Sequence, residues 1–302
     1  MKQILLSIRM LLRFKVYTFI NFTGLVFSIS CALIIARYIH QENNVDHFCP
    51  ELERTFLMTT VMDNGQTYLS GSIDPNKDPN YRNPLSDPCV EKVSQFMLFS
   101  DDYVIVDGRR FTVQAMATDS LYLDMMPHPV IAGKHTLNTP NDAIITYKLA
   151  KRLFKNENPI GKTLKVSTGD VVTVTGVIDE PSTKASVQFE IIISKNLRNS
   201  WSRMASELVQ LHRAEDVTEL NKKNQKPMEL LAYGKRPIFY QLTSLKDFYM
   251  NHNLLVYDKV LRGNRTSLSI LTIVAILLLL VGIFNYVNLH TVVMLRRARE
   301  FG

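Results

Sequence analysis

Cysteine is scarce in this sequence, and none of the three cysteines belongs to a metal-binding pattern. They lie far apart in the chain, as Cys31, Cys49 and Cys89, without the close pairing that zinc sites use. Cys31 falls within a long apolar run, so only Cys49 and Cys89 could form a disulfide, and only in an oxidising compartment. The sequence leaves that disulfide open. The cysteines predict no metal centre.

The sequence also lacks a recognisable set of catalytic residues. Its histidines form no HExxH motif, and no serine lies in a G-x-S-x-G elbow. His128 and His135 could meet Asp119 or Asp124 at a metal, but scattered surface histidines explain the same residues. We therefore expect no catalytic residues, no bound metal and no enzyme activity.

One short motif resembles the end of a phosphate-binding loop. Gly161-Lys162-Thr163 matches its last three positions, but Asn156 stands where the loop needs its first glycine. A helical pattern precedes the motif and a strand-like pattern follows it, which reverses the order found in nucleotide-binding loops. We expect a turn here and no cofactor-binding residues in this chain.

Formal charge is absent from two long stretches. Residues 16–36 and 268–289 contain no Asp, Glu, Lys or Arg and are mainly apolar. Each is long enough to cross roughly 30 Å of hydrocarbon as a helix. The first run is too long for a signal peptide and is not followed by a small-x-small cleavage site. We therefore predict uncleaved transmembrane helices over residues 16–39 and 266–295.

Most of the positive charge flanks these two runs. The formal net charge is +7, and seven basic residues lie at the chain ends: Lys2, Arg9, Arg13, Lys15, Arg296, Arg297 and Arg299. Because Lys and Arg beside a span mark its cytoplasmic side, we predict that both termini are cytoplasmic and that residues 40–265 are periplasmic. The basic excess therefore indicates topology. The central region has no basic aromatic patch, so nucleic-acid binding is not expected.

The first residues have an amphipathic pattern. Three basic residues share one helical face, and four apolar residues share another: Lys2, Arg9 and Arg13; Ile4, Ile8, Leu11 and Leu12. This predicts an interfacial helix over residues 1–15 on the cytoplasmic membrane surface. An earlier start of the first span is the alternative.

The central residues mix strand and helix patterns. Strand-like alternation occurs in residues 54–62, 103–117, 142–147, 163–167, 170–178, 189–194 and 236–242, with a turn at Asp107-Gly108. Helical spacing occurs in residues 89–98, in residues 147–154 and within residues 197–223, with Asp101-Asp102 ending the first of these helices at a turn. Residues 70–88 are rich in Pro, Asn and Asp and predict an exposed loop. The mixture predicts an α+β domain of two lobes.

These pieces together resemble the permease subunits of MacB/FtsX-type ABC transporters, especially those of Bacteroidetes. The resemblance covers nearly the whole chain. It includes "KVYTFINFTGLVFSISCALII", "ENNVDHF", "NDAIITYKLAKRLFKNENPIGKTLKV", "VTVTGVIDEPSTKASVQFEIIIS" and "GIFNYVNLHTVVMLRRAREFG". It implies a MacB-like periplasmic core domain over residues 40–265 and the start of a cytoplasmic coupling segment over residues 296–302.

The resemblance also implies how such a chain works. In this family, ATP-driven closure of cytoplasmic ATPases is transmitted through the spans to periplasmic domains, which export or extract lipids, lipoproteins, peptides or drugs. The implied partners are an ABC ATPase that binds the ATP, a second permease copy and membrane lipids, with a periplasmic adaptor as a further candidate. The implied location is the bacterial inner membrane, as a multi-pass protein.

Two groups of residues fit this mechanism. Asn21, Gly24 and Ser28, together with Cys31, share one face of the first span, where small residues permit close helix packing. Asn285 and Asn288 share a face of the second span and could form interhelical hydrogen bonds, although asparagine is also simply tolerated near an interface.

The segment after the second span is expected to approach the ATPase. Arg297 and Glu300 are therefore candidate coupling residues. The alternative is that they belong to a solvated run of charges beside the membrane.

The chain departs from the family in three places. Residues 122–126 lack the family's phenylalanines, and Phe301 stands where an Ile or Val is usual. The sequence ends at Gly302, whereas the family continues through at least two more spans, so we expect a truncated product or a fragment. Two other classes stay open: a two-span membrane sensor with a periplasmic ligand-binding domain, and a membrane-tethered enzyme.

Overall fold

The chain folds into two compact units. The computed structural model describes residues 15–69, 83–197, 205–229, 237–255 and 260–300. Met1–Asn43 and Asn264–Gly302 form one unit, and Asn44–Gly263 form the other. We call them the helix unit and the sheet unit.

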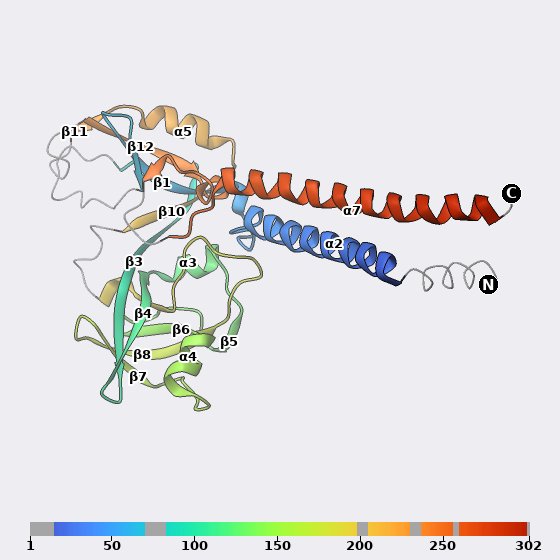
Figure 1. The fold of residues 1–302 in the computed structure, drawn as a ribbon. Helices are drawn as coiled ribbons and strands as arrows, with labels where there is room; N and C mark the ends of the chain where they lie inside the picture. The colour runs from blue at the N-terminus through green and yellow to red at the C-terminus, as the bar shows by residue number, and fades with distance from the viewer. Residues whose placement is uncertain (1–14, 70–82, 198–204, 230–236, 256–259, 301–302) are drawn as a thin grey trace. The chain divides into compact units, whose positions relative to one another are not determined.

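The helix unit contains two long helices, α2 (Lys15–Asn43) and α7 (Arg265–Glu300), which lie side by side and antiparallel (Figure 1). The Asn264 side chain accepts a hydrogen bond from the Ser267 amide at 3.0 Å, which caps the start of α7. The two apolar helices expected from the sequence are thereby confirmed. The interfacial helix predicted over residues 1–15 lies outside the described residues, except for Lys15.

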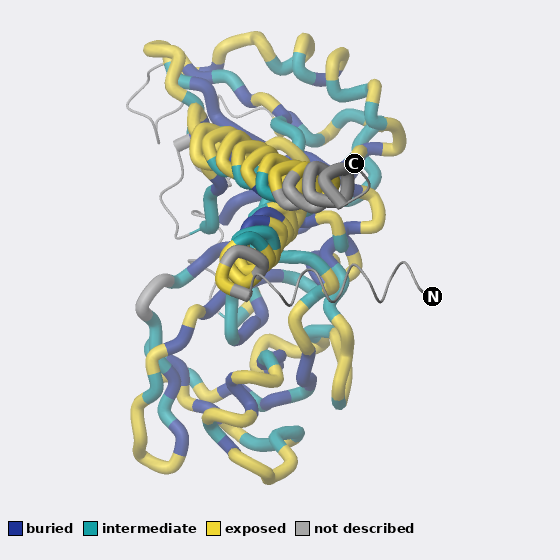
Figure 2. Tube along the Cα trace, turned by 45° about the vertical axis from the view of Figure 1, so that its right-hand side comes forward, coloured by how far each residue is buried: buried dark blue, intermediate teal, exposed yellow. Residues whose placement is uncertain are grey.

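Most of the surface of these helices is exposed, as Figure 2 shows in yellow along both. Large apolar side chains project from them, with Phe19 68%, Leu33 65% and Phe284 65% exposed. Only 11% of the apolar window of α2 and 17% of that of α7 is buried. A core helix of a soluble protein would be mostly buried. Both helices are long and apolar enough to cross a membrane, where lipid would cover these side chains.

The sheet unit is built on one mixed sheet of thirteen strands in the part of the chain that the structure describes. Its main path runs β11-β12-β1-β10-β3-β4-β9-β6-β8-β5, and β2, β7 and β13 pair beside it. The strands are β1 (Thr55–Met62), β2 (Thr67–Leu69), β3 (Val90–Val106), β4 (Arg109–Thr118), β5 (Val130–Gly133), β6 (Asp142–Thr146), β7 (Thr163–Val166), β8 (Val171–Ile178), β9 (Ile191–Ser194), β10 (Ser206–Leu211), β11 (Met228–Glu229), β12 (Pro237–Ser244) and β13 (Leu254–Leu255). The short helices are η1 (Leu52–Arg54), α3 (Ser120–Met125), α4 (Tyr147–Phe154), η2 (Lys195–Leu197), α5 (Asp216–Asn224) and α6 (Leu245–Phe248).

The long strand β3 runs between the two halves of this sheet (Figure 1). In one half, α5 packs with β10 and β12 around Leu211 and Tyr240. In the other half, α4 packs with β6 and β8 around Leu149 and Val174. A third apolar cluster, which includes Phe96 of β3, takes residues from strands of both halves. The predicted α+β class is confirmed.

The helix predicted over residues 89–98 is wrong, because residues 90–98 belong to β3. Alternate side chains, Ser94, Phe96 and Leu98, are buried at 0%, 1% and 8% exposure, as on one face of a strand. β3 pairs with β10 and with β4, so pairing on both sides outweighs the helical spacing of its apolar residues.

The predicted turn at Asp101-Asp102 is also wrong. Both residues lie within β3, and the register with β4 shifts between Phe99 and Asp102, as at a β-bulge. The strand instead ends at Asp107-Gly108, the predicted turn, where φ is 48° and 75°. Two successive residues with positive φ suit a tight hairpin.

The helix predicted within residues 197–223 is only partly right. The segment contains α5, but it also contains β10, whose six residues are all buried. A strand buried on both faces has no alternation to identify it. Of the predicted loop over residues 70–88, residues 70–82 lie outside the described residues.

Candidate functional site

α2 and α7 meet along a seam of small and polar residues. The Asn285 side-chain Nδ2 donates a hydrogen bond to the main-chain oxygen of Asn21 at 2.6 Å. A Cβ added to Gly24 would lie 2.9 Å from the same Nδ2, so glycine leaves the space that Asn285 occupies. The structure thus brings together three of the residues selected from the sequence.

The seam continues one turn further along each helix. Ser28 is 5% exposed, and a Cβ added to Gly282 would lie 3.3 Å from the Ser28 Cβ. Small residues on facing helices let their backbones approach closely. Sequence reasoning missed Gly282, although it lies three residues before Asn285 and therefore on the same face. Asn288, the fifth predicted residue, is exposed.

The two candidate coupling residues lie in the last turns of α7. The helix includes Arg297 and Glu300. Their side chains lie outside the described part of the structure, so their role stays a prediction.

Within the sheet unit, one short segment binds both stretches of chain that lead to the membrane helices. We call residues 44–49, after α2, the first connector, and residues 260–263, before α7, the second connector. The clasp segment, residues 183–186, lies between β8 and β9. The Asp46 amide donates to the Lys184 oxygen at 2.8 Å, and the Leu261 amide donates to the Ser186 oxygen at 2.9 Å. Two distant parts of the sequence are therefore tied to the same few residues.

Asp46 binds the clasp segment through its side chain as well. Its Oδ1 accepts a hydrogen bond from the Ser186 amide at 2.8 Å, and the residue is 0% exposed. Its backbone has a φ of 63°, in the left-handed region that Asp and Asn tolerate best after glycine. Burial raises the pKa of the Asp46 carboxyl to about 6, and the hydrogen bonds from Ser186 and the charge of His47 only partly oppose this.

The second connector is fastened by Arg262. Its guanidinium donates to the main-chain oxygens of Phe248 at 2.7 Å and Leu254 at 2.6 Å, and also to that of Asn251. The same group lies 4.7 Å from the centre of the Phe248 ring. Desolvation lowers the pKa of Arg262 from its usual value. One side chain thus holds the loop after α6 against the second connector.

Gly263 completes this attachment. Its amide donates to the Tyr249 oxygen at 2.9 Å, and a Cβ added to it would lie 2.4 Å from Tyr249 Cε1. The Tyr249 hydroxyl in turn accepts a hydrogen bond from Lys184 Nζ at 2.9 Å. The clasp segment therefore reaches the surroundings of the second connector through a side chain as well as through its backbone.

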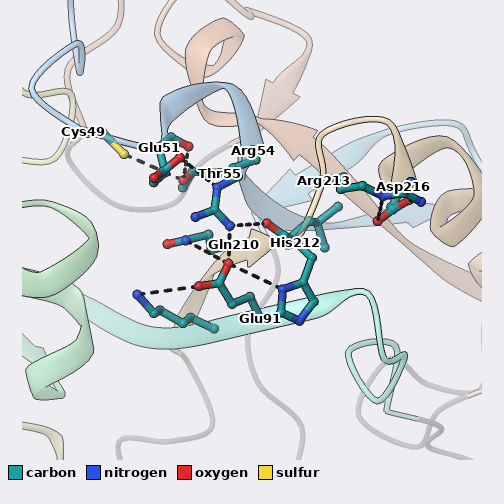
Figure 3. A network of polar contacts seen from close by, with 11 residues as sticks. Cys49, Glu51, Arg54, Thr55, Glu91, Gln210, His212, Arg213 and Asp216 are labelled. Carbon is teal, nitrogen blue, oxygen red and sulfur yellow. Dashed lines mark hydrogen bonds and ion pairs between the residues drawn. The ribbon is translucent and has the colours of Figure 1, made fainter.

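The first connector leads into η1, where Arg54 forms the centre of a polar network (Figure 3). Arg54 donates to Glu51 Oε2 at 2.8 Å and to the Leu211 oxygen at 2.7 Å, and it pairs with Glu91. Gln210 also donates to Glu91, at 3.3 Å. The hydrogen bond from Arg54 lowers the pKa of the Glu91 carboxyl. The network anchors the start of β1 to β3 and β10.

Two of the residues considered for a metal lie close to each other, with His135 Nε2 3.8 Å from Asp124 Oδ1, and the other two have different partners. Asp119 binds Lys195 Nζ at 2.8 Å and Ser94 Oγ at 2.7 Å. His128 lies between the rings of Phe48 and Phe189, and burial lowers its pKa. Among the described residues, no group of three His, Cys, Asp or Glu side chains is placed to hold a metal ion.

The cysteines are free thiols in the structure. Burial raises the pKa of Cys49, whose Sγ lies 3.7 Å from Thr55 Oγ1, and burial raises the pKa of Cys89 to about 11. Since the thiolate is the reactive form, neither thiol is activated at neutral pH.

Gly161 and Lys162 end the connection between α4 and β7, and Thr163 is the first residue of β7. Gly161 has a φ of 84°, and its amide donates to the Val174 oxygen at 2.8 Å. Lys162 pairs with Glu157 and lies 4.8 Å from the centre of the Phe154 ring. A strand follows the motif where a phosphate-binding loop would lead into a helix.

We expect the purified chain to show no saturable binding of Mg-ATP, because this glycine's amide is already bonded and no helix N-terminus follows to hold phosphate. Isothermal titration of the full chain in detergent measures this. Lys162→Ala is the matched variant. Micromolar binding that is lost in Lys162→Ala would contradict the expectation.

The geometry defines a class of protein: a mixed α/β domain inserted between two apolar helices of membrane-spanning length. The family model described as "MacB-like periplasmic core domain" matches residues 18–225, and the chain belongs to this family. The resemblance found in the sequence is confirmed. The chain is a membrane protein with a periplasmic domain, and at the level of the family it is an ABC-transporter-type permease, a class that works with ABC ATPase partners.

The chain also resembles solved structures, and the first of the following shares its fold. A domain of a putative permease protein from Porphyromonas gingivalis is 18% identical with a TM-score of 0.51, over 65% of this chain and 92% of that one. The extracellular domain of the noncanonic ABC-type transporter YknZ from Gram-positive bacteria is 16% identical with a TM-score of 0.46, over 63% and 99%. The periplasmic region of MacB from Actinobacillus actinomycetemcomitans is 18% identical with a TM-score of 0.42, over 62% and 88%. The comparison with curated protein sequences found no match.

Proposed function

We propose that this chain is the transmembrane subunit of a MacB/FtsX-type ABC transporter. In this proposal α2 and α7 carry an ATPase-driven movement to the sheet unit, which exports or extracts a lipid, lipoprotein, peptide or drug. ATP is bound by the partner ATPase and not by this chain. The observation that carries the proposal is a pair of largely exposed apolar helices that are joined by a polar seam. In the sequence, one lies near the start and the other after the end of a MacB-like domain.

The seam suits helices that must move together. In hydrocarbon an unsatisfied amide is costly, so the Asn285 side chain favours its bond to Asn21 over exposure to lipid. Interhelical hydrogen bonds of this kind contribute about 1 kcal/mol in membranes. Close approach at Gly24 and Gly282 adds contact along the same seam. The exposed faces of both helices remain available to lipids, to further spans or to a second permease copy.

The proposal places both termini in the cytoplasm and the sheet unit in the periplasm. Single cysteines at Lys222, which is exposed on α5, and at Gln3, in a background lacking all three native cysteines, test this. We expect an impermeant maleimide to label Lys222→Cys in intact spheroplasts and to label Gln3→Cys only after lysis. The opposite pattern would overturn the topology.

We place the input from the ATPase at the end of α7, at Glu300 with Arg297. An acidic residue is not needed to anchor a basic helix end, so Glu300 has another role in this proposal. In a complex with its ATPase, Glu300→Ala is expected to lower transport-coupled ATPase activity several-fold, as for a lost charged hydrogen bond of about 1 to 2 kcal/mol.

The control for this prediction is membrane insertion, which Glu300→Ala should leave unchanged. Arg297→Ala provides the second variant. Normal coupled activity in both variants, at normal expression, would show that the segment only anchors the helix.

Purification of the tagged full chain from its native membrane tests the proposed function directly. We expect an ABC ATPase to copurify and to hydrolyse ATP. Vanadate should inhibit this hydrolysis, and replacing the lysine in the phosphate-binding loop of the ATPase should abolish it. A copurifying kinase that phosphorylates itself on histidine, without vanadate-sensitive hydrolysis, would favour the sensor.

A further inference from the structure

We propose that residues 183–186 couple the two connectors to each other, so that the sheet unit receives the movements of α2 and α7 as a single input, with Asp46 as the positioning residue. This inference rests on the proposed function, because it assigns the point at which the helices drive the sheet unit. It concerns contacts within the sheet unit alone.

The first argument is the convergence of the hydrogen bonds. Lys184 and Ser186 are separated by one residue, yet they bind Asp46 on one side and Leu261 on the other. Phe48 adds a bond from its amide to Thr183 Oγ1 at 3.1 Å. Every residue of the clasp segment except Ala185 therefore has a hydrogen bond to, or beside, a connector. The shortest hydrogen-bonded route between the connectors runs from Asp46 through Ser186 to Leu261.

The second argument is the position of the clasp segment in the fold. It lies in the loop between β8 and β9, two interior strands of the sheet whose ends Ile178 and Ile191 are 0% exposed. Ser186 is itself 0% exposed, and Val187 is 5% exposed. Close packing resists deformation, so a force on the clasp segment passes into the sheet and is not absorbed by a free loop.

The third argument is that burying the Asp46 carboxyl group at this position costs free energy. A carboxyl group is buried completely, in a left-handed backbone conformation, and among the described residues its Oδ2 has no hydrogen-bond partner. An isolated connector turn would not require a buried carboxylate. What the residue supplies is a doubled attachment, with its amide bound to Lys184 and its Oδ1 bound to Ser186.

Two variants of Asp46 separate its side chain from its backbone conformation. Asp46→Gly removes the carboxylate but keeps a residue suited to a φ of 63°. Asp46→Asn keeps an Oδ1 that can accept from Ser186 and also tolerates this conformation. Both are compared with the unchanged protein as full chains in lipid nanodiscs.

The measurement is hydrogen exchange at the Leu261 amide, which bonds to Ser186 and not to Asp46. With Asp46→Gly, we expect protection at Leu261 to fall by about tenfold or more, together with protection at Ser186. With Asp46→Asn, protection at Leu261 should be kept. The Gly161 amide, which bonds to Val174 elsewhere in the sheet, should be unaffected and reports that the unit is folded. Loss of protection at Ser186 with unchanged Leu261 would overturn the proposal.

A reciprocal variant covers the case in which Asp46→Gly does not fold. Arg262→Met removes the hydrogen bonds that fasten the second connector and keeps much of the side-chain volume. We expect faster exchange at the Asp46 amide, which lies on the first connector. Unchanged exchange at Asp46, with the loop after α6 loosened, would also overturn the proposal.

An ATP-dependent arm distinguishes failure of this inference from failure of the proposed function. The same amides are followed in the unchanged chain copurified with its ATPase, with and without ATP and vanadate. If hydrogen exchange at each connector is the same with ATP and vanadate as without them, the proposed function is contradicted. The response of Leu261 to Asp46→Gly is measured without ATP and decides the coupling by itself.

Discussion

Replacing Gly176 by alanine is expected to separate β5 from β8 and to lower the free energy of unfolding of the sheet unit by about 3 kcal/mol or more. A Cβ at this position would lie 1.9 Å from the main-chain oxygen of Lys134 and 3.1 Å from its carbonyl carbon. A clash with backbone cannot be relieved by a change of rotamer, so the strands must move apart.

The close approach is a feature of both strands. Gly133 pairs with Gly176, and a Cβ on Gly133 would lie 2.2 Å from the Thr175 oxygen. The register shifts in β5 between Val130 and Ala132, so the chain is irregular at this crossing. Because both facing residues are glycine, the main chain at the end of β5 can lie against the main chain of β8. Neither position has room for a side chain.

Gly108→Ala is the matched control. Gly108 has a φ of 75°, but nothing lies within 4 Å of its added Cβ. Its replacement should cost about 1 kcal/mol, from backbone conformation alone. Denaturant unfolding of the full chain, followed by near-ultraviolet circular dichroism, compares the two variants. Equal losses would show that contact at Gly176 is not the cause.

The sequence was informative wherever local pattern decides structure. The helix predicted over residues 147–154 has those bounds in the structure, because its apolar residues Leu149, Ala150 and Phe154 face one core. The hairpin turn at Asp107-Gly108 also follows from two residues that tolerate positive φ. By contrast, β3 was misread because its neighbours β4 and β10 determine its conformation.

The candidate site also has one part that the sequence predicts and one part that it does not. Asn21, Gly24 and Ser28 recur at helical spacing, so the sequence alone is enough to predict a helix-packing face. The clasp could not be predicted, because Asp46, Ser186 and Leu261 are far apart in sequence and only the fold brings them together. The one signal is the turn pattern Glu180-Pro181-Ser182 between two strand patterns. This pattern predicts a loop, but it does not predict which residues the loop binds.

Asp46→Asn is expected to stabilise the sheet unit at neutral pH, by about 1 to 2 kcal/mol. The folded carboxyl has a pKa of about 6 against a reference value of 3.8, mainly because burial disfavours the charged form. Each pKa unit corresponds to about 1.4 kcal/mol of preference for the neutral form. An amide is always neutral and can keep the acceptor that Ser186 needs, so it avoids the cost of the buried charge. Its NH2 group takes the place of Oδ2, which has no hydrogen-bond partner among the described residues, and this offsets about 1 kcal/mol of the gain.

The sign of the pH dependence follows from the same shift. Because the pKa of Asp46 is raised on folding, the folded state binds more protons than the unfolded state between about pH 4 and pH 6. The stabilisation from the neutral carboxyl is fully present below the unfolded pKa and is lost as the pH rises through about 6. The difference between Asp46→Asn and the unchanged chain should therefore grow from about pH 4 to pH 6 and stay constant above.

Thermal unfolding of both full chains in detergent, in steps from pH 4.5 to pH 7.5, measures this difference. Asp142→Asn is the control, because Asp142 is also buried but its carboxylate accepts hydrogen bonds from the amides of Asn138 and Thr139 and from the Thr139 hydroxyl. It should lose stability, by about 1 kcal/mol or more at neutral pH. A variant at Asp46 that is less stable than the unchanged chain at pH 7, or a difference that does not vary with pH, would contradict the argument. If the stabilisation is observed, the charge of Asp46 lowers the stability of the sheet unit, and the hydrogen bond from the Ser186 amide does not depend on that charge.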